Sequence, residues 1–383
     1  MTYHWTLECS SCDERHDASG LPTVCPACGM PWLVRYRHHP SPDLRDAIAR
    51  RGPTMWRYRE WLPIQPDEEP VSLGEGMTPL VRAASIERDL GLDEVWIKDE
   101  SQNPTGSFKA RGMSAAITRA TLGGATAFTV PTAGNAGVAL SAYATRAGCP
   151  ARIFAPQTTP ARLLEQMDVH GGELIAQDGH IGDCGKASRA YARDAGAFDV
   201  STLREPYRIE GKKTLGLELA EQFGWDLPEV IIYPTGGGTG LIGMWKAFDE
   251  LRAASWIPAG SNARLFSVQS TGCAPVVRAF EADRDRTEAW EDPVTVASGL
   301  RVPAPLGGVL ILRGLRETGG CAVAVTDTAL EQSQKQLAAA EGIDMCPEGG
   351  ASVAALTQLV RRGIVERRHR TVLFNTGAGW LYR

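Results

Sequence analysis

The chain has 383 residues, more than one compact domain usually holds, which predicts two lobes and additional segments. The chain is 43% hydrophobic and 22% charged, a composition that excludes a disordered chain, collagen and coiled coil. Its 40 basic and 45 acidic side chains give a formal net charge of −5, which does not favour a nucleic-acid partner. No apolar run is long enough to span a bilayer and the first ten residues lack a signal-peptide core, so we expect a cytoplasmic protein with no membrane partner.

Four of the nine cysteines form two Cys-x2-Cys pairs with twelve residues between them, namely Cys9, Cys12, Cys25 and Cys28. An odd number of cysteines in a cytosolic chain does not indicate a disulfide framework. Two such pairs can instead place four thiolates around one Zn2+. We therefore predict a zinc ribbon in residues 1–37, with a structural metal because no ligand position is left open for water. Free thiols or a redox pair are the alternative.

Residues 38–75 are interrupted by several prolines, with one short helical stretch near residues 44–51, which is typical of a connecting segment. Its large apolar side chains are expected to pack this linker onto the main body, and they are Trp56, Tyr58, Trp61 and Leu62.

From about residue 80 the chain alternates strand and helix patterns. This alternation predicts an α/β fold with parallel sheets that helices cover on both faces. Strands are predicted at 95–98, 126–130, 152–155, 173–176 and 230–233, short apolar runs at 264–269 and 371–374, and helices at 107–122, 136–146, 161–170 and 241–251. Ligands in such folds bind at the carboxyl ends of strands, so the strand-to-helix loops are the expected place of a site.

Four of these loops have unusual sequences, namely Asn103–Lys109, Pro131–Gly137, Pro234–Gly240 and Asn375–Gly379. The third holds four glycines between a strand and a helix, where backbone N–H groups can bind a phosphate. Taken alone, a run of glycines is also typical of a flexible turn, and a lysine such as Lys109 at a helix start is typical of a solvated side chain.

Together the four loops resemble the fold type II pyridoxal-phosphate (PLP) enzymes, and among them the threonine synthases. The resemblance covers about residues 72–379, and it rests on Ser72–Leu80, Lys98–Lys109, Tyr207–Thr214, Glu341–Gly342 with Pro347–Glu348, and Thr376–Gly379. It implies two open parallel-sheet lobes: a large PLP-binding lobe of residues 76–112 and 207–383, and a small mobile lobe of residues 113–206. A leading zinc ribbon is similar to that of one branch of the family, and a homodimer is implied as well.

The resemblance also implies roles for individual residues. Lys109 would bind the PLP aldehyde covalently and move protons at the substrate α-carbon. Asn135 would donate a hydrogen bond to the phenolic oxygen of the cofactor, and Thr376 would face its pyridine nitrogen. The cofactor phosphate would be bound by the loop residues Gly236, Gly237, Gly238, Thr239 and Gly240.

The implied reaction converts O-phosphohomoserine and water to L-threonine and phosphate. Residues expected to bind the amino-acid substrate are Thr132, Arg204 and Arg208, with Lys212 and Lys213 as further cationic donors. The chain departs from the family pattern at Ala110, Ala133 and Leu203. A threonine or serine ammonia-lyase, or a related PLP-dependent elimination or replacement enzyme, is therefore the second hypothesis. A non-catalytic scaffold that carries the ribbon is the third.

Overall fold

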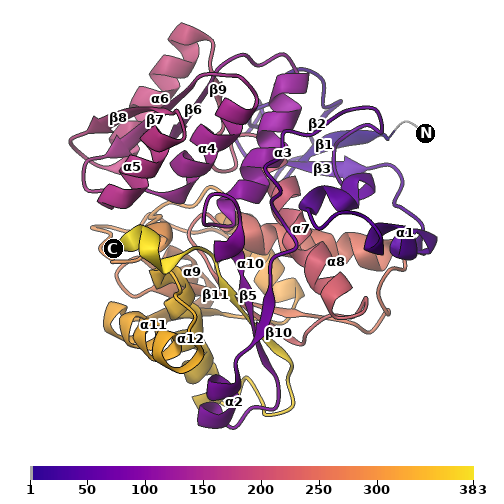
Figure 1. Cartoon of the computed structure of the whole chain (residues 1–383), viewed down its shortest axis with the longest axis vertical. Coiled ribbons are helices and arrows are strands. Elements are labelled where there is room, and N and C mark those ends of the chain that lie inside the picture. Colours follow the sequence, from indigo (N-terminus) through magenta and orange to yellow (C-terminus); the bar gives the residue numbers. More distant parts are fainter. Residues whose placement is uncertain (1–2) are drawn as a thin grey trace.

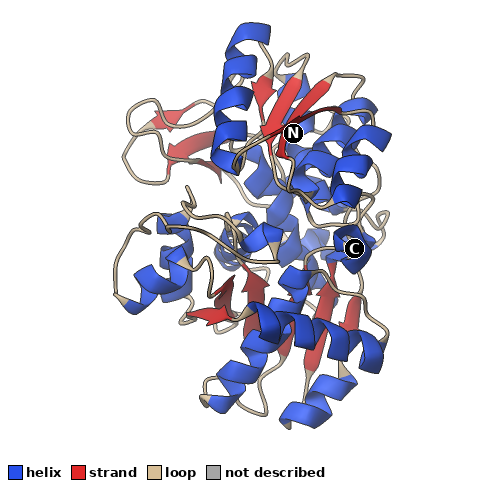
Figure 2. Ribbon diagram, turned by 90° about the vertical axis from the view of Figure 1, so that its left-hand side faces the viewer, coloured by secondary structure: helices blue, strands red, loops and turns tan. Residues whose placement is uncertain are grey.

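The computed structural model describes residues 3–383, in which three sheets are found (Figure 1). Figure 2 shows the four-stranded sheet in its upper half and the six-stranded sheet in its lower half, each with helices beside it. The C-terminus lies at the level between these two sheets in both views. None of the helices in residues 3–383 is long and apolar enough to cross a membrane.

The N-terminal segment forms a small antiparallel sheet, in which β1 (Trp5–Cys9) pairs with both β2 (Arg15–His16) and β3 (Trp32–Tyr36). This sheet is not an independent unit. Its buried Leu7, Trp32 and Val34 belong to the same hydrophobic cluster as Met113 and Ile117 of the long helix α3 (Lys109–Leu122). The ribbon therefore shares a core with the helix that begins at Lys109.

The linker that follows forms η1 (Pro42–Leu44), α1 (Arg45–Ala49) and η2 (Met55–Trp61). Tyr58, Trp61 and Leu62 are fully buried, as the sequence predicted for this segment. Trp56 is only partly buried, and its Nε1 donates to Glu75 Oε1 at 2.9 Å.

The six-stranded sheet has the order β12-β11-β10-β13-β5-β4. Its strands are β4 (Leu80–Arg82), β5 (Val95–Asp99), β10 (Val230–Pro234), β11 (Arg264–Ser270), β12 (Ala322–Val325) and β13 (Thr371–Asn375). All neighbours pair in parallel except β4, which runs antiparallel to β5 at the edge of the sheet. This short edge strand, which the sequence did not predict, is antiparallel in an otherwise parallel sheet, because the chain reverses directly from β4 through a short helix into β5. Its helices are α2 (Ala84–Leu90), α8 (Thr239–Ala253), α9 (Pro275–Glu281), α10 (Gly308–Glu317), α11 (Asp327–Glu341) and α12 (Pro347–Arg361).

The four-stranded sheet is parallel throughout, in the order β8-β7-β6-β9. Its strands are β6 (Phe128–Pro131), β7 (Ala151–Pro156), β8 (Glu173–Gln177) and β9 (Phe198–Asp199), with helices α4 (Asn135–Arg146), α5 (Ala161–Val169) and α6 (Ile181–Ala195). Two parallel-sheet lobes with covering helices confirm the predicted α/β class. The exact residues at which one lobe gives way to the other stay a prediction.

Helices α3 and α7 (Tyr207–Gln222) pack against each other with their backbones in contact. A Cβ on Gly211 would lie 2.0 Å from the carbonyl oxygen of Arg111, so only glycine fits there. Arg111 is fully buried and forms ion pairs with Glu100 (2.6 Å) and with Glu218 of α7, which also binds Lys98 at 2.9 Å. These contacts fix α3, and with it the start of the helix at Lys109, against the large sheet.

Candidate active site

The four unusual loops converge. Lys109 and Asn135 are the first residues of α3 and α4, and Thr376 directly follows β13. The Phe108 N–H donates to the carbonyl of Thr376 at 3.1 Å, and a Cβ on Gly377 would lie 3.4 Å from Asn135 Nδ2. Loops that are far apart in the sequence thus meet at the carboxyl ends of strands from both sheets, where sites of α/β folds are found.

Lys109 lies in this cluster with only part of its side chain exposed, and its Nζ is 4.5 Å from the centre of the Phe108 ring. Burial and, after it, the nearby cation of Arg208 lower the pKa of the Lys109 ammonium to about 7, although the carboxylate of Glu348 partly opposes both. Near neutral pH a large fraction of Lys109 is therefore free amine, the form that adds to an aldehyde.

Asn135 donates from Nδ2 to the hydroxyl of Tyr382 at 2.9 Å, whereas its Oδ1 is buried without a hydrogen-bond partner among the described residues. Tyr382 belongs to η5 (Gly379–Tyr382) at the end of the chain. Sequence reasoning missed this tyrosine, since one aromatic residue near a terminus forms no pattern. The structure places it beside the predicted Asn135.

The glycine loop leads from β10 into α8, whose first residue is Thr239. Gly238 has a φ of 78°, a left-handed conformation that favours glycine, and a Cβ on Gly236 would lie 2.1 Å from the carbonyl oxygen of Gly299. The first N–H groups of a helix have no partner within the helix. The loop and the start of α8 therefore offer the kind of N–H donors that bind a phosphate.

Arg208 lies beside the glycine loop and is 1% exposed. Its Nη1 donates to the Val200 carbonyl at 2.7 Å and to Thr202 Oγ1 at 3.4 Å, while Nε and Nη2 have no partner in residues 3–383. A Cβ on Gly237 would lie 2.8 Å from Thr202 Cγ2. A buried guanidinium with two free donors needs an acceptor, and an anion next to Lys109 would supply one.

The other predicted substrate residues differ in their surroundings. Thr132 Oγ1 accepts from the Gly134 N–H at 3.1 Å and so shapes the loop before Asn135. Arg204 is partly buried in the turn that precedes α7, where it lies two residues after Thr202.

The two lysines of α7 do not provide the free cations expected of them. Lys213 is fully buried, and its Nζ pairs with Glu210 at 2.7 Å and with Glu250 at 2.8 Å. Lys212 Nζ donates to the carbonyl of Phe108. Because the Nζ atoms of both lysines already have partners inside the protein, the expectation that they bind a substrate phosphate is wrong for Lys213. For Lys212, whose pKa burial lowers well below its usual range, it stays a prediction.

The start of α12 contributes the remaining polar groups. Cys346 caps this helix, and its Sγ lies 3.5 Å from Thr376 Oγ1. Glu348 accepts a hydrogen bond at Oε1 from the Gly299 N–H at 2.7 Å, whereas its buried Oε2 has no partner in the described chain. The sequence motif contained Glu348 but indicated no role for it.

The four ribbon cysteines also come together, and their four Sγ atoms all lie within 4.8 Å of one another. The shortest separations are 3.4 Å between Cys9 and Cys28, 3.5 Å between Cys12 and Cys28, and 3.7 Å between Cys12 and Cys25. Four sulfurs at about 2.3 Å from a tetrahedral Zn2+ would lie about 3.8 Å apart. The geometry of the thiolates therefore fits a zinc ion.

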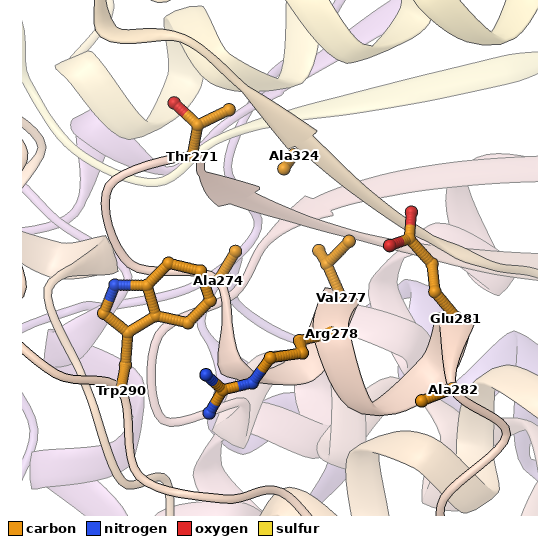
Figure 3. A pocket seen from close by; sticks show the side chains of 8 residues that line it. All are labelled: Thr271, Ala274, Val277, Arg278, Glu281, Ala282, Trp290 and Ala324. Atoms are coloured by element: carbon orange, nitrogen blue, oxygen red, sulfur yellow. The ribbon is translucent and has the colours of Figure 1, made fainter.

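A separate surface pocket lies between α9, β12 and the loop that carries Trp290 (Figure 3). Its one cationic side chain, Arg278, already donates to the carbonyl of Ala289 at 2.9 Å and lies 4.9 Å from the centre of the Trp290 ring. None of its lining residues belongs to the four loops. The Lys109 cluster, with several unpartnered buried polar atoms, is therefore the candidate active site.

Comparisons with known proteins identify the family to which the chain belongs. Residues 71–377 match the family model "Pyridoxal-phosphate dependent enzyme". A threonine synthase of Methanocaldococcus jannaschii is 31% identical over 97% of this chain and 91% of that protein, and one of Methanosarcina acetivorans is 30% identical over 98% and 91%. Similar solved structures include an L-serine ammonia-lyase of Rhizomucor miehei (TM-score 0.68, 23% identity, 79% of this chain and 93% of that one) and maize serine racemase (TM-score 0.67, 23% identity, 79% and 88%), which show the shared fold. The chain belongs to the pyridoxal-phosphate-dependent enzyme family, in its threonine synthase group.

Proposed function

We propose that the protein is a PLP-dependent threonine synthase, which converts O-phosphohomoserine and water to L-threonine and phosphate. The observation that carries this proposal is the pair of unpartnered Arg208 donors beside Lys109 and the glycine loop. The glycine loop accounts for one phosphate, that of the cofactor. A second, buried cationic donor set is what a phosphorylated substrate requires.

In this proposal the chain binds PLP through the groups that meet in the cluster. When bound, the cofactor stabilises negative charge on the substrate carbons next to the amino group. Lys109 would hold its aldehyde and would take the proton from the substrate α-carbon. Asn135 and Thr376 would contact the ring, and backbone N–H groups of residues 236–240 would donate hydrogen bonds to its phosphate. The near-neutral pKa of Lys109, about 7, supports the role of this residue.

Arg208 is the proposed ligand of the substrate phosphate, because a guanidinium offers two parallel donors and stays charged. Thr132 and Arg204 are the other residues proposed to bind the substrate. Thr132 also shapes the loop before Asn135, and Arg204 lies in the turn next to Thr202. Ala133 and Leu203 remove polar groups that the family pattern has in these loops. The substrate assignment therefore depends mainly on Arg208.

A direct comparison of substrates tests the proposal. Purified holoenzyme is incubated with O-phosphohomoserine, L-threonine and L-serine, and phosphate, threonine and 2-oxo acids are measured. We expect equal amounts of phosphate and threonine from O-phosphohomoserine. Release of 2-oxo acid from unphosphorylated L-threonine or L-serine alone would instead assign the ammonia-lyase activity that the departures at Ala133 and Leu203 leave open.

The ribbon is proposed to hold one structural Zn2+ per chain, bound by its four cysteines. We expect elemental analysis to find one zinc per chain. Because the ribbon shares a core with α3, a chelator should also lower the melting temperature of the protein. The decrease should be at least about 2–4 °C, which is the effect of losing about 1 kcal/mol of stability in a mid-sized protein. Cys25→Ser should have the same effect, and Cys149→Ser, outside the ribbon, should not. Protein purified without chelator that contains no zinc would contradict the assignment.

Two further features are proposed: a homodimer, which the family resemblance implies, and a cytoplasmic location. The small-molecule partner is an amino acid, and neither a nucleic acid nor a membrane is proposed as a partner. The acidic net charge of −5 is in keeping with the first of these two exclusions.

A further inference from the structure

Glu348 is a buried carboxylate in the candidate site that has no part in the mechanism described so far. Its side chain is 4% exposed, and it is the second residue of α12, in the first turn. Its Oε1 is held by the Gly299 N–H at 2.7 Å, and its Oε2 is buried without a partner in residues 3–383. The Tyr382 hydroxyl and the Cys346 thiol lie close to this carboxylate, but neither is at hydrogen-bond geometry with Oε2, so Oε2 is open to a donor on a bound molecule.

The surroundings of Glu348 place it at the reacting atoms. Its negative charge partly opposes burial and Arg208, which lower the pKa of Lys109. After the larger effect of burial, it also raises the pKa values of the Tyr382 hydroxyl and the Cys346 thiol. Tyr382 in turn accepts the hydrogen bond of Asn135. Glu348 is therefore near the amine, the ring-binding amide and the helix cap at the same time.

The short helix η4 (Ser298–Leu300) donates the hydrogen bond that Glu348 accepts, from Gly299. The same helix lies against the glycine loop and against the loop before Asn135. A Cβ on Gly236 of the glycine loop would lie 2.1 Å from the Gly299 carbonyl oxygen. A Cβ on Gly134, before Asn135, would lie 3.7 Å from Ser298 Oγ. The hydrogen bond from Gly299 thus fixes the carboxylate between loops from the two sheets.

The proposed reaction needs a proton acceptor besides Lys109. Once Lys109 has taken the proton from the α-carbon, it cannot also take one from the water that adds at the β-carbon. Burial, first, and then Glu348 keep the pKa values of Cys346 and Tyr382 well above their usual ranges, so both stay protonated. Glu205 is buried nearby, but both of its oxygens already accept backbone N–H groups, from Tyr207 and Arg208.

We propose that Glu348 is a catalytic residue of the addition step, in which its Oε2 takes a proton from the attacking water. The inference rests on the proposed function. One O–H bond of water breaks and its proton goes to Glu348, while the oxygen forms a bond to the β-carbon. The electron pair of the carbon–carbon double bond moves onto the α-carbon, where the cofactor, when bound, would stabilise the negative charge. Before this step the phosphate has left the γ-carbon, to which a proton has moved in place of one lost from the β-carbon. After it, Lys109 returns its proton to the α-carbon, and the proton of the water passes from Glu348 to solvent in exchange for the one that the released phosphate takes up, so that threonine and hydrogen phosphate are the products.

The test uses the holoenzyme with Glu348→Gln, which keeps an acceptor for Gly299 but cannot take a proton, and with Glu348→Asp. Glu341→Gln is the matched control, since Glu341 also accepts a backbone N–H, that of Ser85, at 2.5 Å but lies outside the site. In Glu348→Gln we expect phosphate release to continue while threonine formed per phosphate falls by about tenfold or more. The unsaturated amino acid left without water should appear as 2-oxobutyrate and ammonia, and Glu348→Asp should restore part of the threonine.

Unchanged threonine per phosphate in Glu348→Gln would overturn the proposal, and so would an equal loss of both products, which indicates a structural role. If wild type releases no phosphate, the proposed function itself fails, and a second readout decides the place of Glu348. Removing its charge should lower the pH at which the visible absorbance of the Lys109-bound cofactor titrates, by about one unit. If the absorbance titrates at the same pH in Glu348→Gln and in wild type, this carboxylate does not face the reacting atoms.

Discussion

Replacing Lys109 by alanine is expected to abolish the visible absorbance of the bound cofactor and to lower the rate of threonine formation by about 100- to 10,000-fold, the range for losing a positioned proton-transfer group. The reason is that Lys109 is the amine of the cluster whose burial brings its pKa to about 7. The variant should fold, because the lysine begins α3 and its side chain forms no ion pair among the described residues. Absorbance spectra and the rate of threonine formation measure the two effects.

Lys335→Ala is the matched control, since Lys335 is an exposed lysine on α11. Its spectrum and rate should equal those of wild type. The neighbouring Lys212 is a second buried amine, but its Nζ donates to the Phe108 carbonyl. An unchanged cofactor spectrum in Lys109→Ala would contradict the assignment of Lys109 and point to another lysine.

Replacing Arg208 by glutamine should lower kcat/KM for O-phosphohomoserine by about 10- to 100-fold, since a hydrogen bond between charged partners contributes about 1.5–3 kcal/mol. We expect KM to rise and kcat to fall, because the phosphate is bound in the ground state and must also be stabilised as it leaves. Arg208→Lys keeps the positive charge but not the two parallel donors, so its kcat/KM should lie between those of wild type and Arg208→Gln.

Arg208 is buried, so folding must be measured together with activity. Arg252→Gln is a suitable control, because Arg252 is an arginine on α8 whose Nη1 pairs with Asp249 at 2.7 Å, outside the cluster. A melting temperature near that of wild type together with unchanged kcat/KM in Arg208→Gln would show that this guanidinium does not bind the substrate.

The sequence predicted the fold class and most strands correctly, because strand patterns and the loops between them are local. The strand predicted at residues 230–233, for example, is β10, and the helix predicted at 107–122 begins at Lys109, since Ser107 forms a bridge with Gly377. The helix α7 was not predicted as an element. Residues Tyr207–Ala220 are buried on all sides, so this helix lacks the one-sided apolar pattern that identifies a surface helix.

The candidate site could be predicted only where it coincides with a motif. Lys109, Asn135 and the glycine loop lie in such motifs, and the structure brings them together. Tyr382 and the role of Glu348 depend on contacts between segments far apart in the sequence, such as that between Gly299 and Glu348, which no local pattern reveals. The buried ion-pair cluster of Glu210, Lys213 and Lys246 could not be predicted either. The Tyr36 hydroxyl donates to Glu210 Oε2 of this cluster at 2.6 Å. The same charged residue types occur in buried ion pairs and on solvated surfaces, so the sequence does not distinguish the two.

The most direct test of the proposed threonine synthase activity is the reaction of O-phosphohomoserine in water labelled with oxygen-18. The account predicts that the carbon–oxygen bond to phosphate breaks and that water adds at the β-carbon. Threonine should therefore contain one labelled oxygen, in its hydroxyl group, and the released phosphate none, as measured by mass spectrometry of both products. Label in the phosphate, or labelled homoserine-type hydrolysis products without threonine, would contradict it.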